Sequence, residues 1–261
     1  MRPRILTRPH QATAKTITYF IAILCALDAH ASILVLRGSG SMVATYGGLQ
    51  WKNFSAALDS ASDNKVTAVS SLENRAELFS SKGLLIEWRA KEPFTPPFDD
   101  HKRLTTLETQ NLADFIAAGH RVVMLGEWDP WRTWNQEILG IVGGTYVGTV
   151  NSAVTSAVAP HAVVRGASSL TLQYSGLANG GTPLYSHNFA TLWGDKLNVL
   201  TILDSVYSDD NWPLNNGGTF ATNVANWLAV PEPSCIALVC GAMLSVAWTA
   251  CRHTRYPKRT P

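Results

Sequence analysis

Cysteine is absent from the long central part of this sequence. The 261 residues include four cysteines, of which Cys25 lies near the N-terminus and Cys235, Cys240 and Cys251 lie near the C-terminus. Residues 32–230 can therefore form no disulfide, and they contain no thiolate nucleophile and no cysteine ligand for a metal. At about 200 residues, this part is long enough to bury a hydrophobic core without such cross-links.

Charged side chains are absent from a second region, the apolar run 235–251. Only Ser245 and Thr249 are markedly polar in it. The run can therefore lie in the hydrocarbon of a bilayer, although it is near the lower limit of roughly 17 residues needed to cross one. The segment that follows carries positive charges on Arg252, Arg255, Lys258 and Arg259. Such charges favour the cytoplasmic side, so the sequence predicts a C-terminal transmembrane helix with the preceding chain outside.

A short motif with two prolines precedes this run. It consists of Val230, Pro231, Glu232, Pro233 and Ser234. The prolines hold the chain extended, which is a conformation in which a processing enzyme can bind a peptide. Residues 230–261 resemble the PEP-CTERM sorting signal of Gram-negative bacteria, in which a Pro-Glu-Pro motif, a hydrophobic segment and a basic cluster follow one another.

The resemblance implies recognition by an exosortase, a membrane-embedded enzyme that is similar to cysteine proteases. One feature departs from the family pattern, because the basic residues are spread over several positions with His253 among them. A plain C-terminal tail anchor is the alternative interpretation.

Residues 1–31 have the pattern of a secretory signal peptide. An apolar stretch, 16–27, is followed by Ala29-His30-Ala31, an A-x-A cleavage site for signal peptidase, and an uncleaved anchor is the alternative. The basic residues before the apolar stretch are Arg2, Arg4, Arg8 and Lys15. The two terminal signals predict export across the inner membrane, anchoring in the membrane during sorting, and a final place at the cell surface or outside the cell.

The charge of the exported part differs from that of the whole chain. The whole chain has a formal charge of +2, but eight of its 21 basic residues lie in the two terminal segments. Residues 32–230 contain 13 Lys and Arg against 17 Asp and Glu, a difference of −4. An acidic domain of this kind is not expected to bind nucleic acid.

Short apolar runs alternate with helical patterns along the first half of the exported part, which predicts one α/β domain over residues 32–229, with a mainly parallel sheet flanked by helices. The second half is predicted to be richer in strands. The expected strands are 33–36, 66–69, 84–88, 121–126, 145–150, 162–164, 170–174 and 198–204; the expected helices are 49–58, 72–79, 104–118 and 220–228.

Residues 112–127, with 134–139 and 142–144, resemble the class I glutamine amidotransferase-like fold, a flavodoxin-like arrangement. The match consists of a helix containing Phe115 and closed by Gly119, a strand ending in Gly126, and a short helix that bears Trp134 and Asn135. Catalytic members of that family carry a cysteine in the sharp turn after the strand. Here the turn is Leu125-Gly126-Glu127-Trp128, so the resemblance implies the fold without the usual chemistry.

Functional groups in open α/β sheets gather beyond the carboxyl ends of the strands. This rule selects Ser39, Glu127, Asp129 and Asp204, with His187 supplied by a loop. A serine, a histidine and carboxylates could form a hydrolase site. However, the sequence contains no G-x-S-x-G elbow and no phosphate-binding loop, so structural turns are the favoured interpretation and no catalytic residue is assigned.

Two further groups of residues have an alternative interpretation as ligand-binding sites. Trp131 and Trp134 are expected to pack in the core, whereas Trp128 could be an exposed platform for a sugar ring, which would connect the protein with extracellular polysaccharide. The oxygen-rich stretch from Asp204 to Asn215 could hold Ca²⁺, but it lacks the alternation of a calcium loop, so a solvated acidic loop is favoured. We therefore expect no metal and no cofactor.

The composition and motifs favour an exported binding or structural module without catalytic activity. The alternative is an extracytoplasmic hydrolase that uses serine or carboxylate chemistry on the same scaffold. A pocket with a nucleophile and a base within hydrogen-bonding distance would favour the hydrolase.

The sorting motif can be tested apart from the folded domain. Replacing Pro231, Glu232 and Pro233 together by alanine is expected to leave export intact and to cause the uncleaved protein to accumulate in the membrane, because the motif is separate from both the signal peptide and the core. Cell fractionation and mass spectrometry of the C-terminus provide the measurement. Normal processing of the triple variant would show that the motif is not used.

Overall fold

The computed structural model describes residues 32–38, 45–89, 103–204 and 216–230. The chain divides into two compact units, and the described residues belong to one of them, Ala31–Glu232. The cleavage site at Ala29 and Ala31, the motif after Val230 and the basic tail lie outside the described residues, so they remain predictions. Within the described ranges, no helix is both long and apolar enough to cross a membrane.

A seven-stranded sheet forms the centre of the described unit, in the order β2-β1-β3-β4-β9-β8-β7. The first five strands in that order are parallel, and β8 and β7 are added antiparallel. The mainly parallel sheet predicted from the sequence is therefore confirmed. The strands are β1 (Ile33–Leu36), β2 (Val66–Val69), β3 (Gly83–Ile86), β4 (Arg121–Leu125), β7 (Thr182–Pro183), β8 (Ala190–Trp193) and β9 (Val199–Ile202).

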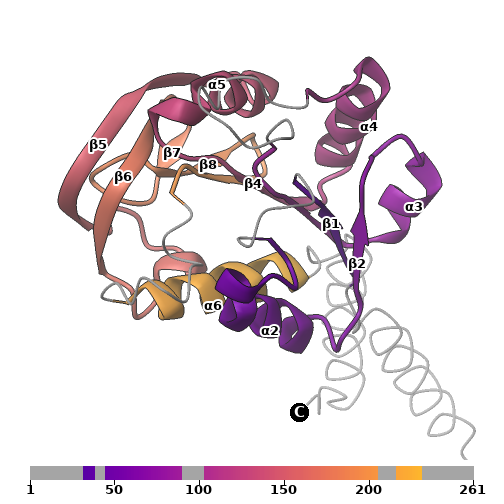
Figure 1. Cartoon of the computed structure of the whole chain (residues 1–261), viewed down its shortest axis with the longest axis horizontal. Coiled ribbons are helices and arrows are strands. Elements are labelled where there is room, and N and C mark those ends of the chain that lie inside the picture. Colours follow the sequence, from indigo (N-terminus) through magenta and orange to yellow (C-terminus); the bar gives the residue numbers. More distant parts are fainter. Residues whose placement is uncertain (1–31, 39–44, 90–102, 205–215, 231–261) are drawn as a thin grey trace, which may run out of the picture. The chain divides into compact units, whose positions relative to one another are not determined.

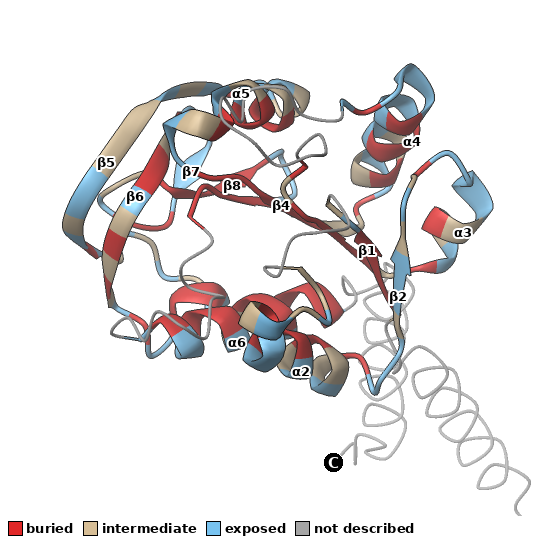
Figure 2. Cartoon of the chain, in the orientation of Figure 1, coloured by how far each residue is buried: buried red, intermediate tan, exposed pale blue. Residues whose placement is uncertain are grey.

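Helices cover both faces of this sheet (Figure 1). On one face lie α3 (Arg75–Ser80), α4 (Thr106–Ala117) and α5 (Arg132–Ile141), and on the other lie α2 (Lys52–Ala61) and α6 (Gly217–Ala229). Side chains alternate between the two faces of a strand, so Val123 and Leu125 of β4 enter one core and Val122 and Met124 enter the other. The central strands are therefore apolar along most of their length, and Figure 2 shows them buried.

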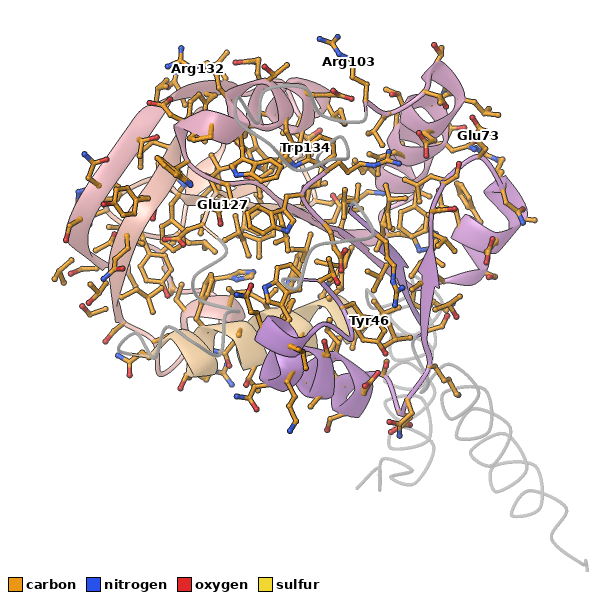
Figure 3. The ribbon with its side chains drawn as sticks, in the orientation of Figure 1. Tyr46, Glu73, Arg103, Glu127, Arg132 and Trp134 are labelled. Carbon is orange, nitrogen blue, oxygen red and sulfur yellow. The ribbon has the colours of Figure 1, made fainter. Side chains whose placement is uncertain are left out.

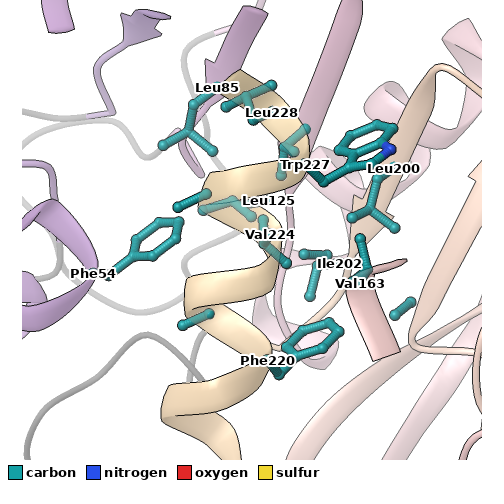
Figure 4. Close-up of a cluster of buried hydrophobic side chains, with 14 of the residues drawn as sticks. Phe54, Leu85, Leu125, Val163, Leu200, Ile202, Phe220, Val224, Trp227 and Leu228 are labelled. Atoms are coloured by element: carbon teal, nitrogen blue, oxygen red, sulfur yellow. The ribbon is translucent and has the colours of Figure 1, made fainter. Parts of the chain in front are cut away.

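The last helix, α6, fills the core on its side of the sheet. Phe220, Val224 and Leu228 are fully buried on one face of the helix, and Figure 4 shows them beside side chains of the central strands. Phe54 of α2 belongs to the same cluster. The core on this side of the sheet therefore combines α2 and α6, which lie far apart in the sequence.

The β-rich second half predicted from the sequence is a long hairpin, β5 (Thr145–Ser156) with β6 (Ser169–Asn179), which forms its own two-stranded sheet. Several details of the prediction were wrong. Residues 162–164, expected as a strand, form the short helix η3 (Ala162–Val164), because His161 caps the turn and Val163 is buried against α6. The strands β7 and β8 were not predicted. The remaining short helices are η1 (Leu49–Trp51) and η2 (Asp129–Trp131).

A buried ion pair fixes the start of α4. Thr105 and Glu108 form a reciprocal capping box, and the Glu108 carboxylate also accepts from the backbone N–H of Leu72 at 3.1 Å. Arg89 lies 3.6 Å from the same carboxylate, and both side chains are 2% exposed. Burial alone would raise the pKa of Glu108, but the hydrogen bonds from Thr105 and Leu72, together with the charge of Arg89, lower it.

We expect Glu108→Gln to reduce the free energy of unfolding by about 3–5 kcal/mol at neutral pH, because it leaves Arg89 buried without a counterion. Asp114→Asn is the matched control on the same helix: it breaks the exposed pair with Arg75 and should cost less than about 1 kcal/mol. Urea denaturation of both variants gives the comparison.

The contribution of Glu108 to the free energy of unfolding is expected to depend on pH in one direction. A lowered pKa in the folded state means that the ionised Glu108 stabilises the fold above its unfolded-state pKa of about 4.3, and that this contribution is lost as the pH falls below that value. The difference between wild type and Glu108→Gln should therefore shrink in acid. A difference that is independent of pH would contradict this assignment.

Candidate functional site

Carboxylate residues follow three neighbouring parallel strands at the carboxyl edge of the sheet. Glu87 follows β3, Glu127 follows β4 and Asp204 follows β9. Leu125 pairs with Ile202, and Glu127 and Asp204 each lie two places beyond that pair. Their side chains are 0%, 4% and 2% exposed respectively. The rule that ligands bind at this edge of an α/β sheet makes it the candidate site.

The turn after β4 is held by residues of the helix that follows it. Asn135 is fully buried; its Oδ1 accepts from the Glu127 backbone N–H at 3.0 Å, and its Nδ2 donates to the Glu127 carbonyl oxygen. Trp134 Nε1 donates to the Leu125 carbonyl at 2.8 Å. Trp131 is also buried, so the prediction that Trp131 and Trp134 pack in the core is confirmed. Figure 3 shows Trp134 and Glu127 within the body, whereas Arg132 projects from it.

Strand β6 covers the same turn. Gly176 donates its backbone N–H to the Leu203 carbonyl at 2.7 Å, and a Cβ at Gly176 would lie only 2.5 Å from the Glu127 carbonyl oxygen. The adjacent Ser175 is fully buried, and its hydroxyl donates to the carboxylate of Asp204. The hairpin therefore seals the turn after β4.

An exposed aromatic pair lies beside this seal. Trp128 is 36% exposed and Tyr174 51% exposed, and their ring centroids are 5.1 Å apart. Tyr174 has a positive φ of 57°, an uncommon conformation for a residue other than glycine. The structure thus leaves Trp128 accessible, as the sugar-platform hypothesis requires.

Asp129, next to Trp128, takes part in a polar network at the surface. Its carboxylate accepts from Arg132 at 3.1 Å and from the Tyr146 hydroxyl at 3.1 Å, and its backbone N–H donates to Thr149 Oγ1 at 2.9 Å. These contacts tie η2 and α5 to the hairpin. Asp129 therefore has a structural role in addition to any contact with a ligand.

Glu87 was not recognised in the sequence. The predicted strand 84–88 placed it inside the strand, whereas β3 ends at Ile86 and leaves Glu87 in the turn. Its carboxylate accepts from the backbone N–H of Gly38 at 2.9 Å and of Tyr46 at 2.6 Å, which lie before and after residues 39–44 in the sequence. Burial raises the pKa of Glu87, while the two hydrogen bonds and Arg37 oppose that rise.

Of the other predicted site residues, the structure describes His187 but not the rest. His187 lies between β7 and β8, its backbone N–H donates to Thr155 Oγ1 at 3.0 Å, and its Nδ1 is buried without a hydrogen-bond partner. Ser39 and the acidic stretch 205–215 lie outside the described residues. Among the residues that the structure describes, no group of three or more His, Cys, Asp or Glu side chains could hold a metal ion.

The seal can be tested with two glycine substitutions. Gly176→Ala should lower the free energy of unfolding by about 1–3 kcal/mol, because the new methyl group meets a backbone carbonyl that cannot move aside. Gly140→Ala is the control: it lies in α5 with nothing within 4 Å of the added atom, and it should raise stability by about 1 kcal/mol. An unchanged urea midpoint for Gly176→Ala would show that the hairpin does not press on this turn.

Comparison with known proteins was made for sequence and for structure. No protein-family model and no curated protein sequence matches the chain. Among solved structures, the chain is similar to a GMP synthase-type protein from Thermoplasma acidophilum, with a TM-score of 0.51, 11% identity, and coverage of 84% of this chain and 98% of that one.

Two other solved structures show the same likeness. The N-terminal domain of mmIFT52 has a TM-score of 0.56 and 12% identity, and the match covers 77% of this chain and 98% of that domain. A cytoplasmic protein from Salmonella typhimurium has a TM-score of 0.51 and 11% identity, with 76% and 99% covered. At such identities only the fold is shown: an α/β unit with a mainly parallel sheet flanked by helices, similar to the amidotransferase-like fold.

Proposed function

We propose that this protein is exported, sorted by an exosortase-type system and associated with the cell surface, and that its folded part is a binding or structural module without catalytic activity. The two terminal sequence signals support the sorting and the location. Signal peptidase and the exosortase are the processing partners in this proposal, and nucleic acid is not a partner.

One observation carries the non-catalytic part of the proposal. In the turn after β4, a buried glutamate stands where the resembled family has its cysteine, and the Asn135 side chain and Gly176 hold that turn against α5 and β6. A nucleophile must be reached by its substrate at about 3 Å. The backbone and side chain of Glu127 lack that access in the observed structure.

Extracellular polysaccharide is the proposed ligand class. The accessible rings of Trp128 and Tyr174 offer apolar faces on which sugar rings can stack. The exposed charged groups of Asp129 and Arg132 lie next to Trp128 and could bond to sugar hydroxyls. This arrangement suits a surface module that holds a polymer without cleaving it.

A hydrolase is the second candidate, and one observation favours it. Glu127 and Asp204 are two buried carboxylate residues at the ends of adjacent strands, and paired carboxylates are the machinery of glycoside hydrolysis. That chemistry requires a cleft between the two groups for the sugar and, in inverting enzymes, a water molecule. Ser175 and Gly176 of the hairpin pack against this pair of residues instead.

The two candidates can be distinguished by an activity assay. Three proteins are purified: the wild type, the variant Glu127→Gln and, as a control at an exposed position, the variant Asp195→Asn. Each is incubated with glutamine, simple esters and polysaccharides. We expect no turnover above the buffer rate in any of the three proteins. Turnover that is lost in Glu127→Gln and kept in Asp195→Asn would overturn the non-catalytic proposal and favour the hydrolase.

A further inference from the structure

The two ends of the folded unit meet at the amino edge of the sheet. Ser32, which precedes β1, accepts a hydrogen bond from the Lys82 backbone N–H at 2.9 Å. The end of α6 reaches the same place, because a Cβ on Gly83 would lie 2.5 Å from the Leu228 carbonyl oxygen. Arg121, at the start of β4, donates to the Trp227 carbonyl at 2.5 Å and lies over the Trp227 ring. The chain therefore enters and leaves the unit beside Lys82.

Basic side chains line this edge, although the exported part is acidic. Lys65 immediately precedes β2, Lys82 precedes β3 and His120 precedes β4, while Lys196 lies in the turn before β9. Neighbouring strands are about 4.8 Å apart, so Lys65 and Lys82 lie on either side of Ser32 in one row. Burial lowers the pKa of His120, and the charges of Lys82 and Lys196 lower it further.

Two acidic residues lie in the same turns as these basic residues. Asp63 precedes Lys65 in one turn and Asp195 precedes Lys196 in another. Counting Lys65, Lys82, Arg121 and Lys196 against these two gives a local charge of +2, in contrast to −4 for residues 32–230. Two exposed apolar residues, Leu197 (41% exposed) and Val230 (53% exposed), lie at the same edge.

We infer that the amino edge of the sheet, with Lys65, Lys82 and Lys196, is a membrane-facing surface that binds the headgroups of anionic phospholipids. The inference rests on the proposed function, because it requires that the apolar run 235–251 lies in a bilayer. Five residue steps separate Val230 from Cys235, which allows a separation of at most roughly 18 Å. Lysines held so near a membrane surface are attracted by anionic lipids over a distance set by the ionic strength.

This orientation has a consequence for the candidate site. Parallel strands place their amino ends at one edge and their carboxyl ends at the other. If the amino edge rests on the lipid, then Glu87, Glu127 and Asp204, together with the exposed pair Trp128 and Tyr174, lie at the edge that points away from the membrane. The candidate site is then directed away from the membrane while the chain is anchored for sorting.

The test uses the full chain reconstituted in nanodiscs of phosphatidylcholine alone or of phosphatidylcholine with phosphatidylglycerol. Hydrogen exchange is followed in the turns 62–65, 81–83 and 194–198, with residues 126–129 at the opposite edge as the internal reference. We expect exchange in the three turns to slow by roughly fivefold or more in the anionic discs, and to return to the neutral-disc rate in 1 M salt. Equal rates in both kinds of disc would overturn the inference.

Charge-removing variants distinguish lipid binding by the three lysines from non-specific adsorption of the protein. The triple variant Lys65→Gln, Lys82→Gln and Lys196→Gln should lose the lipid-dependent protection. The matched triple Lys52→Gln, Arg75→Gln and Arg165→Gln removes as much charge elsewhere and should keep it. Protection that survives the first triple would assign the effect to other residues and contradict the inference.

Failure of the proposed function gives a different result. If the apolar run does not enter a bilayer, the chain will not co-purify with discs of either composition, and both the membrane sorting and this inference are then wrong. If the chain enters both kinds of disc but shows no lipid-dependent protection, the proposed sorting still stands. Only the inference that the amino edge binds anionic lipids is then overturned.

Discussion

The conformation of the turn after β4 is the constraint on which the account of this protein depends. Both polar ends of the Asn135 side chain bind the backbone of Glu127, and Trp134 donates to Leu125 at the end of the strand. A buried amide with unsatisfied groups would be costly, so these bonds fix one geometry of the turn. That geometry leaves a surface on which β6 can pack with Gly176 and Ser175, and the packing in turn buries Glu127 and Asp204.

The sheet separates two kinds of surface. At its carboxyl edge, buried carboxylates are satisfied by local donors: Glu87 by the N–H groups of Gly38 and Tyr46, and Asp204 by Ser175. At its amino edge, lysines surround the two ends of the folded unit. The two edges of the sheet therefore differ in the sign of their charged groups.

Much of the fold could be predicted from the sequence, because the apolar runs that form β1, β3, β4 and β9 are buried on both faces. The helix α4 and its stop at Gly119 were equally clear, whereas its capping residues were not predicted. Elements decided by long-range packing were missed. Val163 and Val164 favour a strand by propensity, yet packing against α6 makes them helical, and the Trp88 side chain made β3 look longer than it is. Glu87 was therefore placed inside the strand and was not recognised as a site residue. The packing of Gly176 on the turn after β4 was also missed, because Gly176 is more than 40 residues from Glu127 in the sequence.

Native-state hydrogen exchange of the backbone amides of Glu127 and Gly176 tests the central claim most directly. Local opening and global unfolding differ in their free energies and in their dependence on denaturant. If Asn135 and the hairpin seal the turn, both amides will exchange only through global unfolding, with the same free energy and denaturant slope as Val123 in the middle of β4. Exchange through a smaller opening free energy that is independent of denaturant would contradict the account, because it would reveal a site that opens under native conditions.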